Sequence, residues 1–451
     1  MSTRISRRNM LKGLALAAGG TVLAACAPKA TEAPAAAATQ APAEATNPAA
    51  TPAPAGPVKL TMWTYPGDEL FLADMFKLYQ EKNPNVSMEI VKITNEDADQ
   101  KFTTNLVAGA GLPDVADIEQ GWFRKRVYSP GILDLTPYKA ASHKDEMPKW
   151  CWDAGLSPDQ SQILFLYYSV GVAVIHYRRS LFKAAGLPSD PDSVQALISK
   201  DWPSNLTVGD KISKPGGPWM FDAAGTVFGQ YRDQYNPVWY DESTKKFMID
   251  VPPMLDGLKL AADVRKRGLD AKMSEWTPEW ESTFKQTTVA TYPIGDWLPI
   301  LLQAYGGDAT KGDWGMVTCP GDTGASNGGS LFCAFEQGKF QEEAAKLLLF
   351  FTFDLEAQMR LINYYNFPSL IKAWDDPRMQ QPVEWYGGQQ TRLVSAAGAK
   401  KFSDRKYTPY DDQCNTIMGT ELTNCLDQGK DPQQALADAQ KTAETQIVLK
   451  S

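Results

Sequence analysis

The amino-acid sequence predicts an α/β fold with parallel strand pairing, because strand and helix patterns alternate along its first folded segment. Residues 58–62 alternate in side-chain character, which is typical of a strand. Asp68 then stands where it can cap a helix, and the helix pattern ends at Asn83. Residues 86–90 alternate again as a second strand, so this segment has the order strand, helix, strand.

A second helix is expected over 97–110, and the apolar run 115–119 predicts a third strand after a Gly-Leu-Pro-Asp break. The residues expected on the buried side of that helix are Phe102, Leu106 and Val107. Further along, 344–353 and 432–448 are helix candidates. A chain of 451 residues has the length of two or three domains, and its 43% of hydrophobic residues is enough for sizeable cores.

The N-terminus has the pattern of an export signal rather than of a folded element. Residues 1–25 carry four basic side chains and no acidic one, with an apolar stretch too short to remain as a membrane span. Residues 6–12 resemble the twin-arginine export motif, and residues 23–26 resemble a lipobox. We therefore expect cleavage before Cys26, followed by acylation of that cysteine. Export by the general route stays open.

Residues 26–57 are dominated by Ala, Pro, Thr and Glu, a composition that predicts a disordered tether. Lipid and tether together predict a protein anchored through Cys26 to the outer face of the cell membrane. The protein is expected to be a monomer. The formal net charge of −8 becomes more negative when the basic signal is removed. This balance argues against nucleic acid as a partner and against a basic membrane-binding patch.

Five cysteines remain after the predicted cleavage, and their odd number and wide spacing do not fit a disulfide framework. They are Cys151, Cys319, Cys333, Cys414 and Cys425. Cys319 and Cys333 flank a glycine-rich stretch and could pair outside the cell. Cys414 and Cys425 are too far apart to pair if one continuous helix holds both. Buried free thiols are the favoured interpretation.

Five stretches, in this order along the chain, resemble the extracellular solute-binding proteins of carbohydrate importers. They are Val58–Tyr65, Gly111–Val115, Gly131–Tyr138, Val170–Leu187 and Ile294–Trp297. The resemblance spans roughly residues 58–440. The chain departs from the family pattern at Arg178 and Arg179, which stand where the family has Asn and Lys, and at Asp296.

The resemblance implies a two-lobed periplasmic-binding-protein-like fold of type II, with a hinge cleft between the lobes. Lobe 1 would comprise 58–168 plus 319–365, and lobe 2 would comprise 169–318 plus 366–451. The strands that cross between the lobes are expected near Tyr168, Thr318 and Tyr365. It also implies a substrate-binding protein that hands a sugar or oligosaccharide to the transmembrane subunits of an ABC importer.

A sugar presents flat C–H faces and many hydroxyl groups, so its site needs aromatic rings beside Asp, Glu, Asn or Gln side chains. In open α/β sheets such sites lie beyond the carboxyl ends of strands. The candidate ligand-binding residues are Trp63, Tyr65, Asp68, Glu119, Gln120, Trp122, Tyr240, Asp296, Trp297, Gly329, Ser330 and Tyr365. Alternatives stay open: Trp63 can be core, Asp68 a plain helix cap, and Gly329 part of a hairpin turn.

Catalysis is not expected, and neither is a cofactor or a metal. The two histidines, His143 and His176, cannot supply a three-histidine zinc site, and no G-x-S-x-G motif occurs. His176 lies in an apolar run and is expected to be structural, while Trp276 and Trp280 are expected to form core or cleft wall. Two alternatives remain: the same fold binding a polyamine or peptide, or a surface carbohydrate-active enzyme that uses a pair such as Glu119 and Asp296.

Overall fold

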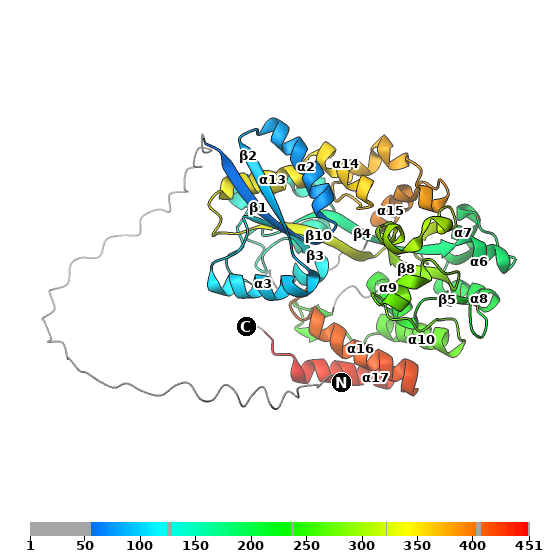
Figure 1. Ribbon diagram of the computed structural model, residues 1–451. Helices are drawn as coiled ribbons and strands as arrows, with labels where there is room; N and C mark the ends of the chain where they lie inside the picture. Colours follow the sequence, from blue (N-terminus) through cyan, green and yellow to red (C-terminus); the bar gives the residue numbers. More distant parts are fainter. Residues whose placement is uncertain (1–55, 124–128, 236–238, 322, 403–406, 450–451) are drawn as a thin grey trace, which may run out of the picture. The chain divides into compact units, whose positions relative to one another are not determined.

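The computed structural model describes residues 56–449 except 124–128, 236–238, 322 and 403–406 (Figure 1). The predicted signal, Cys26 and nearly all of the predicted tether lie outside the described residues. The strands are β1 Val58–Thr64, β2 Val86–Lys92, β3 Val115–Glu119, β4 Leu166–Arg178, β5 Trp219–Phe221, β6 Tyr240–Asp241, β7 Lys246–Phe247, β8 Val289–Gly295, β9 Trp314–Thr318 and β10 Ser326–Ala334.

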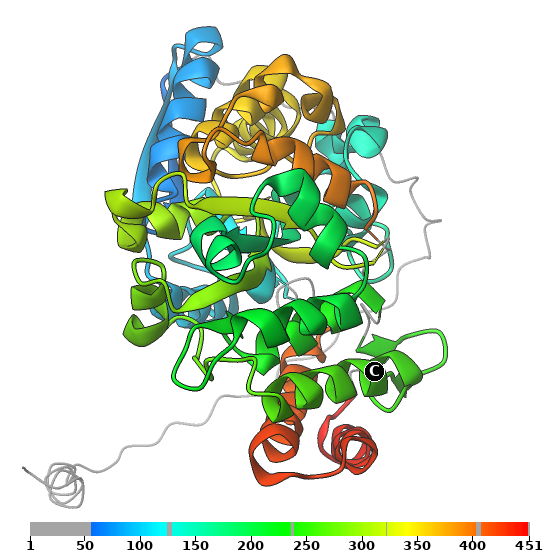
Figure 2. The same ribbon diagram turned by 90° about the vertical axis from the view of Figure 1, so that its right-hand side faces the viewer.

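The α-helices are distributed along the whole described chain. They are α2 Glu69–Lys82, α3 Asn95–Ala108, α4 Gln120–Phe123, α5 Lys149–Ala154, α6 Arg179–Ala184, α7 Pro191–Ile198, α8 Trp202–Ile212, α9 Ala224–Tyr235, α10 Pro252–Lys266, α11 Pro278–Thr283, α12 Leu298–Leu301, α13 Gln341–Phe353, α14 Leu355–Leu361, α15 Thr391–Ala399, α16 Asp411–Gln428 and α17 Pro432–Gln446. The helices α16 and α17 pack side by side and against α10 (Figure 2).

One mixed sheet runs through the described chain in the order β2-β1-β3-β10-β4-β8-β5, and β9 also pairs with β4. β1 pairs in parallel with both β2 and β3, as the alternating strand and helix patterns predict. β5 and β8 are also parallel, whereas β10 and β4 run antiparallel to their neighbours. The α/β class predicted from the sequence is therefore confirmed.

The long strand β4 joins the two parts of this sheet. Its first half pairs with β10, and its second half, from Ala173, pairs with β8 and β9. The segment around Phe367 also runs beside β4, where the N–H of Val170 donates to the carbonyl oxygen of Phe367 at 2.8 Å. All residues of β4 are buried, because the strand has neighbours on both edges and layers on both faces. The lobe boundaries given by residue number stay a prediction.

The first two helices confirm their predicted ranges to within a few residues, with one error in the buried face. In α2 the buried side chains include Phe71, Met75 and Tyr79, as the helical period requires. In α3, Phe102 is buried, but Val107 is 86% exposed. Five residues along a helix correspond to about 140° of rotation from Phe102, and this turns Val107 toward solvent. The expectation for Val107 was therefore wrong.

The five cysteines within the described chain are buried and free, as the favoured interpretation holds. Cys319 is tied to the hinge region, because its thiol donates to the carbonyl oxygen of Ala173 at 3.0 Å. Cys414 and Cys425 lie on one helix, α16. Within the described ranges, no helix combines the length and the apolar character needed to cross a membrane.

Candidate ligand-binding site

Carboxyl groups gather where β1 and β3 end. The Asp117 carboxylate accepts hydrogen bonds from the hydroxyls of Thr64 at 2.9 Å and Tyr168 at 3.0 Å. It also shares a side-chain hydrogen bond with Asp68, and Glu119 lies close enough to act on both. Burial raises the pKa of Asp117 to about 7. Burial, followed by the charge of Asp117, raises the pKa of Asp68 well above its ordinary value.

Asp68 therefore has a different role from a plain helix cap. The structure gives it no side-chain capping bond to α2, and its carboxyl turns to Asp117 instead. Asp117 itself was not among the predicted residues, because its position inside β3 has the sequence pattern of a core residue. Only the tertiary fold shows that its carboxylate meets Asp68 at the strand end.

Several other predicted residues meet the same sheet edge. The N–H of Glu119 donates to the Tyr65 hydroxyl at 3.4 Å, and Ser330 of β10 is paired with Glu119 across the sheet. Gln120 accepts a hydrogen bond from the Ser326 hydroxyl at 3.0 Å. We call this group the carboxylate cluster: Tyr65, Asp68, Asp117, Glu119, Gln120 and Ser330.

Two neighbouring predictions did not gain the same support. Trp63 is half-buried and packs edge-to-face on Phe102 with ring centroids 5.3 Å apart, which fits the core alternative. Trp122 lies in α4, but its side chain is outside the described part of the structure.

A second group forms where the parallel strands β5 and β8 end. The indole N–H of Trp297 donates to the carbonyl oxygen of Asn327 at 2.8 Å. The ring of Trp276 stacks on Trp297 with centroids 5.6 Å apart and planes 19° apart. Both tryptophans were expected to form core or cleft wall. Trp280 is fully buried and belongs to the core, whereas Trp276 is 61% exposed and presents its ring to solvent.

Two carboxyl groups that were not predicted from the sequence lie in the same group as these rings. Asp222, directly after β5, accepts a hydrogen bond from the indole N–H of Trp280 at 2.9 Å. Burial, with a further contribution from the charge of Asp222, raises the pKa of Glu275 to about 8. We call this group the indole cluster: Asp222, Glu275, Trp276, Trp280 and Trp297. The position of Asp222 at a strand end was a usable signal, but that of Glu275 in a loop was not.

Adjacent residues of β10 connect the two clusters. The Ser326 hydroxyl binds Gln120 of the carboxylate cluster, and the Asn327 carbonyl binds Trp297 of the indole cluster. Both clusters also lie at the carboxyl ends of parallel strands, where α/β folds place their ligands. The arrangement combines aromatic faces with hydrogen-bonding carboxyl and amide groups.

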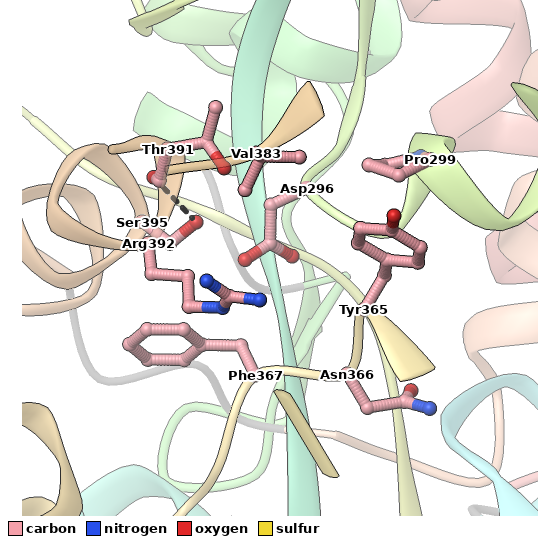
Figure 3. A pocket seen from close by; sticks show the side chains of 9 residues that line it. All are labelled: Asp296, Pro299, Tyr365, Asn366, Phe367, Val383, Thr391, Arg392 and Ser395. Atoms are coloured by element: carbon pink, nitrogen blue, oxygen red, sulfur yellow. Dashed lines mark hydrogen bonds between the residues drawn. The ribbon is translucent and has the colours of Figure 1, made fainter. Parts of the chain in front are cut away.

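The structure brings Asp296 and Tyr365 together in a pocket of about 300 Å³, a volume that includes open solvent (Figure 3). We call it the hinge pocket; its lining residues are Asp296, Pro299, Tyr365, Asn366, Phe367, Val383, Thr391, Arg392 and Ser395. The Asp296 carboxylate accepts from the N–H of Val172 at 3.0 Å and also interacts with the Ser395 hydroxyl. Burial raises the pKa of Asp296 to about 7.

Arg392 was missed because it lies in α15, almost one hundred residues after Asp296 and outside any recognisable motif. Its guanidinium donates to the carbonyl oxygens of Gln381 at 3.2 Å and Ile362 at 3.0 Å. These two bonds fix its orientation, and burial lowers its pKa.

Two predicted residues have other roles. Tyr240 is buried, and its ring packs on Tyr410 and Phe247 rather than on a residue of either cluster. Gly329 lies inside β10 and not in a hairpin turn, with φ of +117°, and an added side chain there would meet the Ser169 carbonyl at 2.7 Å. The glycine therefore allows close approach of β4, and a ligand contact at Gly329 stays a prediction.

His176 is structural, as expected. It is fully buried, its Nε2 donates to the Gly295 carbonyl at 2.9 Å, and its Nδ1 accepts from the Tyr386 hydroxyl at 2.7 Å. Burial lowers its pKa to about 3. Among the described side chains, no group of three or more His, Cys, Asp or Glu residues is arranged to hold a metal ion.

The raised carboxyl pKa values predict that stability falls as pH rises. Asp117 and Asp296 titrate near pH 7 in the folded protein and near pH 4 when unfolded, so between these values the folded state binds more protons. The free energy of unfolding, measured with denaturant, should be lower at pH 8 than at pH 5 by more than about 1.4 kcal/mol, the equivalent of one pKa unit. The substitution Asp68→Asn removes one repulsive charge and should reduce that loss. Equal stability at both pH values would contradict this assignment.

Comparison with known proteins identifies the family. Residues 74–384, more than half of the chain, match the family of bacterial extracellular solute-binding proteins. The chain therefore belongs to this family. It is also 28% identical over 203 residues to the arabinooligosaccharide-binding protein of Bacillus subtilis (strain 168), a match that covers 42% of this chain and 44% of that protein. The chain thus spans less than half the length of that relative.

Solved structures share the fold across nearly their whole length. A crystal structure described as an extracellular solute-binding protein of family 1 is 24% identical, with a TM-score of 0.76 over 86% of this chain and 99% of that one. The GacH receptor of Streptomyces glaucescens is 14% identical, with a TM-score of 0.71 over 86% and 98%. The lacto-N-biose-binding protein of Bifidobacterium longum is 16% identical, with a TM-score of 0.71 over 87% and 97%. The two-lobed fold predicted from the resemblance is confirmed.

Proposed function

We propose that the chain is the substrate-binding lipoprotein of an ABC importer, which captures a sugar or oligosaccharide between its lobes and delivers it to the membrane permease. The observation that carries the proposal is the exposed ring of Trp276, which stacks on Trp297 in the cluster that also holds the carboxyl groups of Asp222 and Glu275. An indole face suits the C–H face of a sugar ring, and carboxylates accept hydrogen bonds from its hydroxyls.

The relatives support the same class of ligand. The matched Bacillus subtilis protein is described as binding arabinooligosaccharides, the GacH receptor was solved with acarbose, and the Bifidobacterium longum protein was solved with lacto-N-biose. Each is a carbohydrate-type ligand longer than one ring, and stacked indole rings can accommodate such a ligand.

A cationic solute is the second candidate, because the described parts of both clusters carry carboxyl groups. Asp68, Asp117 and Glu119 lie in one cluster and Asp222 and Glu275 in the other. The enzyme alternative has less support, because its two carboxyl groups would have to act as a pair. Glu119 interacts with Asp117 in the carboxylate cluster, whereas Asp296 is hydrogen-bonded in the hinge pocket.

Thermal unfolding against a panel of oligosaccharides and polyamines separates the two candidates. A ligand at about a hundred times its dissociation constant adds roughly 2.7 kcal/mol of stability. For a protein of this size each kcal/mol moves the midpoint by roughly 2–4 °C. A shift of several degrees with oligosaccharides alone supports the proposal. A shift with spermidine alone would overturn it in favour of a cationic cargo.

We also propose that residues 1–25 are removed on export and that lipid on Cys26 holds the protein at the outer face of the membrane. Cys26→Ala is then expected to move the protein from the membrane fraction to the soluble fraction. Cell fractionation followed by immunodetection measures this. Retention of the variant in the membrane at the wild-type level would contradict lipid anchoring. Substitution of Ala27 by Ser, beside the cysteine, serves as the matched control and should leave the protein in the membrane.

A further inference from the structure

We propose that Tyr407 competes with the imported solute for Gln120: its hydroxyl occupies the Gln120 side-chain amide in the ligand-free protein, and the solute binds there by displacing it. This inference rests on the proposed function, because it concerns the same ligand site. It adds a residue outside both clusters, Tyr407, and assigns it an effect opposite in sign to that of a ligand contact.

The side-chain amide of Gln120 is already engaged within the protein. Its oxygen accepts a hydrogen bond from the Ser326 hydroxyl at 3.0 Å, and its nitrogen donates to the Tyr407 hydroxyl. Gln120 follows β3 directly, at the strand end where α/β folds bind their ligands, yet it is only 4% exposed. A ligand can therefore reach this amide only after Tyr407 moves aside.

Tyr407 belongs to a segment that is anchored away from β3. The next residue, Thr408, is buried, and its N–H and hydroxyl donate to the Asp411 carboxylate at 3.1 and 2.6 Å. Tyr410 lies in a hydrophobic core together with side chains of α10, α16 and α17. Tyr407 itself packs against a different core, which contains Ile118 of β3. Its side chain thus reaches from a segment held by one core to an amide beside the other.

The phenol hydroxyl of Tyr407 has the same hydrogen-bonding groups as a sugar hydroxyl. Each can accept a hydrogen bond from an amide N–H and donate its own proton. A sugar hydroxyl can therefore replace the phenol at Gln120 without leaving the buried amide unsatisfied, which would be costly. Tyr407 is half-buried, so its ring borders solvent into which it can turn.

Tyr407→Phe, which removes only the hydroxyl, is expected to raise the affinity for arabinotriose or maltotriose about fivefold, the equivalent of the net strength of one hydrogen bond. The gain should lie in the association rate, because the binding-competent form of the free protein becomes more populated while the complex is unchanged. Stopped-flow tryptophan fluorescence measures both rates. Tyr305→Phe, on an exposed tyrosine outside both clusters, is the matched control and should bind as the wild type does.

The Gln120→Ala background shows whether the gain acts through Gln120. Tyr407→Phe should add nothing there, because the amide with which its hydroxyl bonds is gone. The unfolding midpoint checks that each variant folds. Unchanged or weaker binding in Tyr407→Phe, or the same gain in the Gln120→Ala background, would overturn the proposal.

A measurement on the ligand-free protein separates this inference from the proposed function. The side-chain amide signal of Gln120 in NMR spectra, identified by its absence in Gln120→Ala, should exchange its protons with water about fivefold faster in Tyr407→Phe. An unchanged exchange rate would overturn the inference even if oligosaccharides bind. Faster exchange in a protein that binds neither trisaccharide would contradict the proposed function and leave the contact between Tyr407 and Gln120 standing.

Discussion

Trp276→Ala is expected to weaken oligosaccharide binding by about thirtyfold or more, while the protein keeps its fold. The ring is 61% exposed and stacks on Trp297, so it presents a face to a ligand and contributes little to the core. Loss of an aromatic anchor in a binding site typically costs about 2 kcal/mol or more. Its backbone has φ of +64°, a strained conformation for a residue with a large side chain, which is a feature often found at ligand sites.

The matched control is Tyr305→Ala, which removes another exposed aromatic ring, 42% exposed, outside both clusters. Calorimetric titration should give the wild-type affinity for this variant. Circular dichroism and the unfolding midpoint check that both variants fold. If Trp276→Ala bound oligosaccharide as tightly as Tyr305→Ala, the indole cluster would not be the site.

Arg178→Ala is expected to destabilise the protein by about 3–5 kcal/mol, because it leaves a buried ion pair without its cation. Arg178 is 2% exposed, its Nη2 lies 2.7 Å from Asp313, and it donates to the Gln286 carbonyl at 2.8 Å. Its guanidinium also lies 4.8 Å from the ring centroid of Trp314. The free energy of unfolding in denaturant measures the loss.

Arg267→Ala provides the comparison for this second prediction. Arg267 pairs with Asp210 and Asp263 near the surface, where ion pairs contribute at most about 1 kcal/mol. The double variant Arg178→Ala with Asp313→Ala should recover part of the loss, because it removes the unpaired carboxylate as well. A loss in Arg178→Ala no larger than that in Arg267→Ala would show that the buried pair does not hold this region together.

The structural role of Arg178 also explains why the chain departs from the family pattern there. Arg178 and Arg179 bind carbonyls and Asp313 within the fold, and neither reaches the two clusters. The departure therefore changes internal packing around β9 rather than the ligand contacts of the described clusters.

The fold could be predicted where the pattern was local. The alternation in β1 and β2 and the helical period of α2 depend only on which side chains face the core, so the sequence was sufficient for them. The long strand β4 was harder to place, because a strand covered on both faces is apolar throughout and has no period. The error at Val107 shows that an apolar residue at a helix end need not be buried.

The candidate site was only partly predictable, since it depends on contacts between distant segments. Residues at strand ends, such as Tyr65 and Glu119, were found because position alone indicates them. Arg392 and Glu275 became candidates only when the fold brought them beside Asp296 and Asp222. Asp68 has the sequence features of a helix cap, and only its bond to Asp117 shows the other role.

We propose that this protein captures an oligosaccharide and returns it unchanged. Calorimetric titration with arabinose-based and glucose-based oligosaccharides, followed by chromatography of the recovered sugar, tests this proposal. We expect one oligosaccharide to bind per protein, Trp276→Ala to bind it with lower affinity, and the recovered sugar to have its original length. Shortened sugar after incubation, or heat only from polyamines, would contradict it.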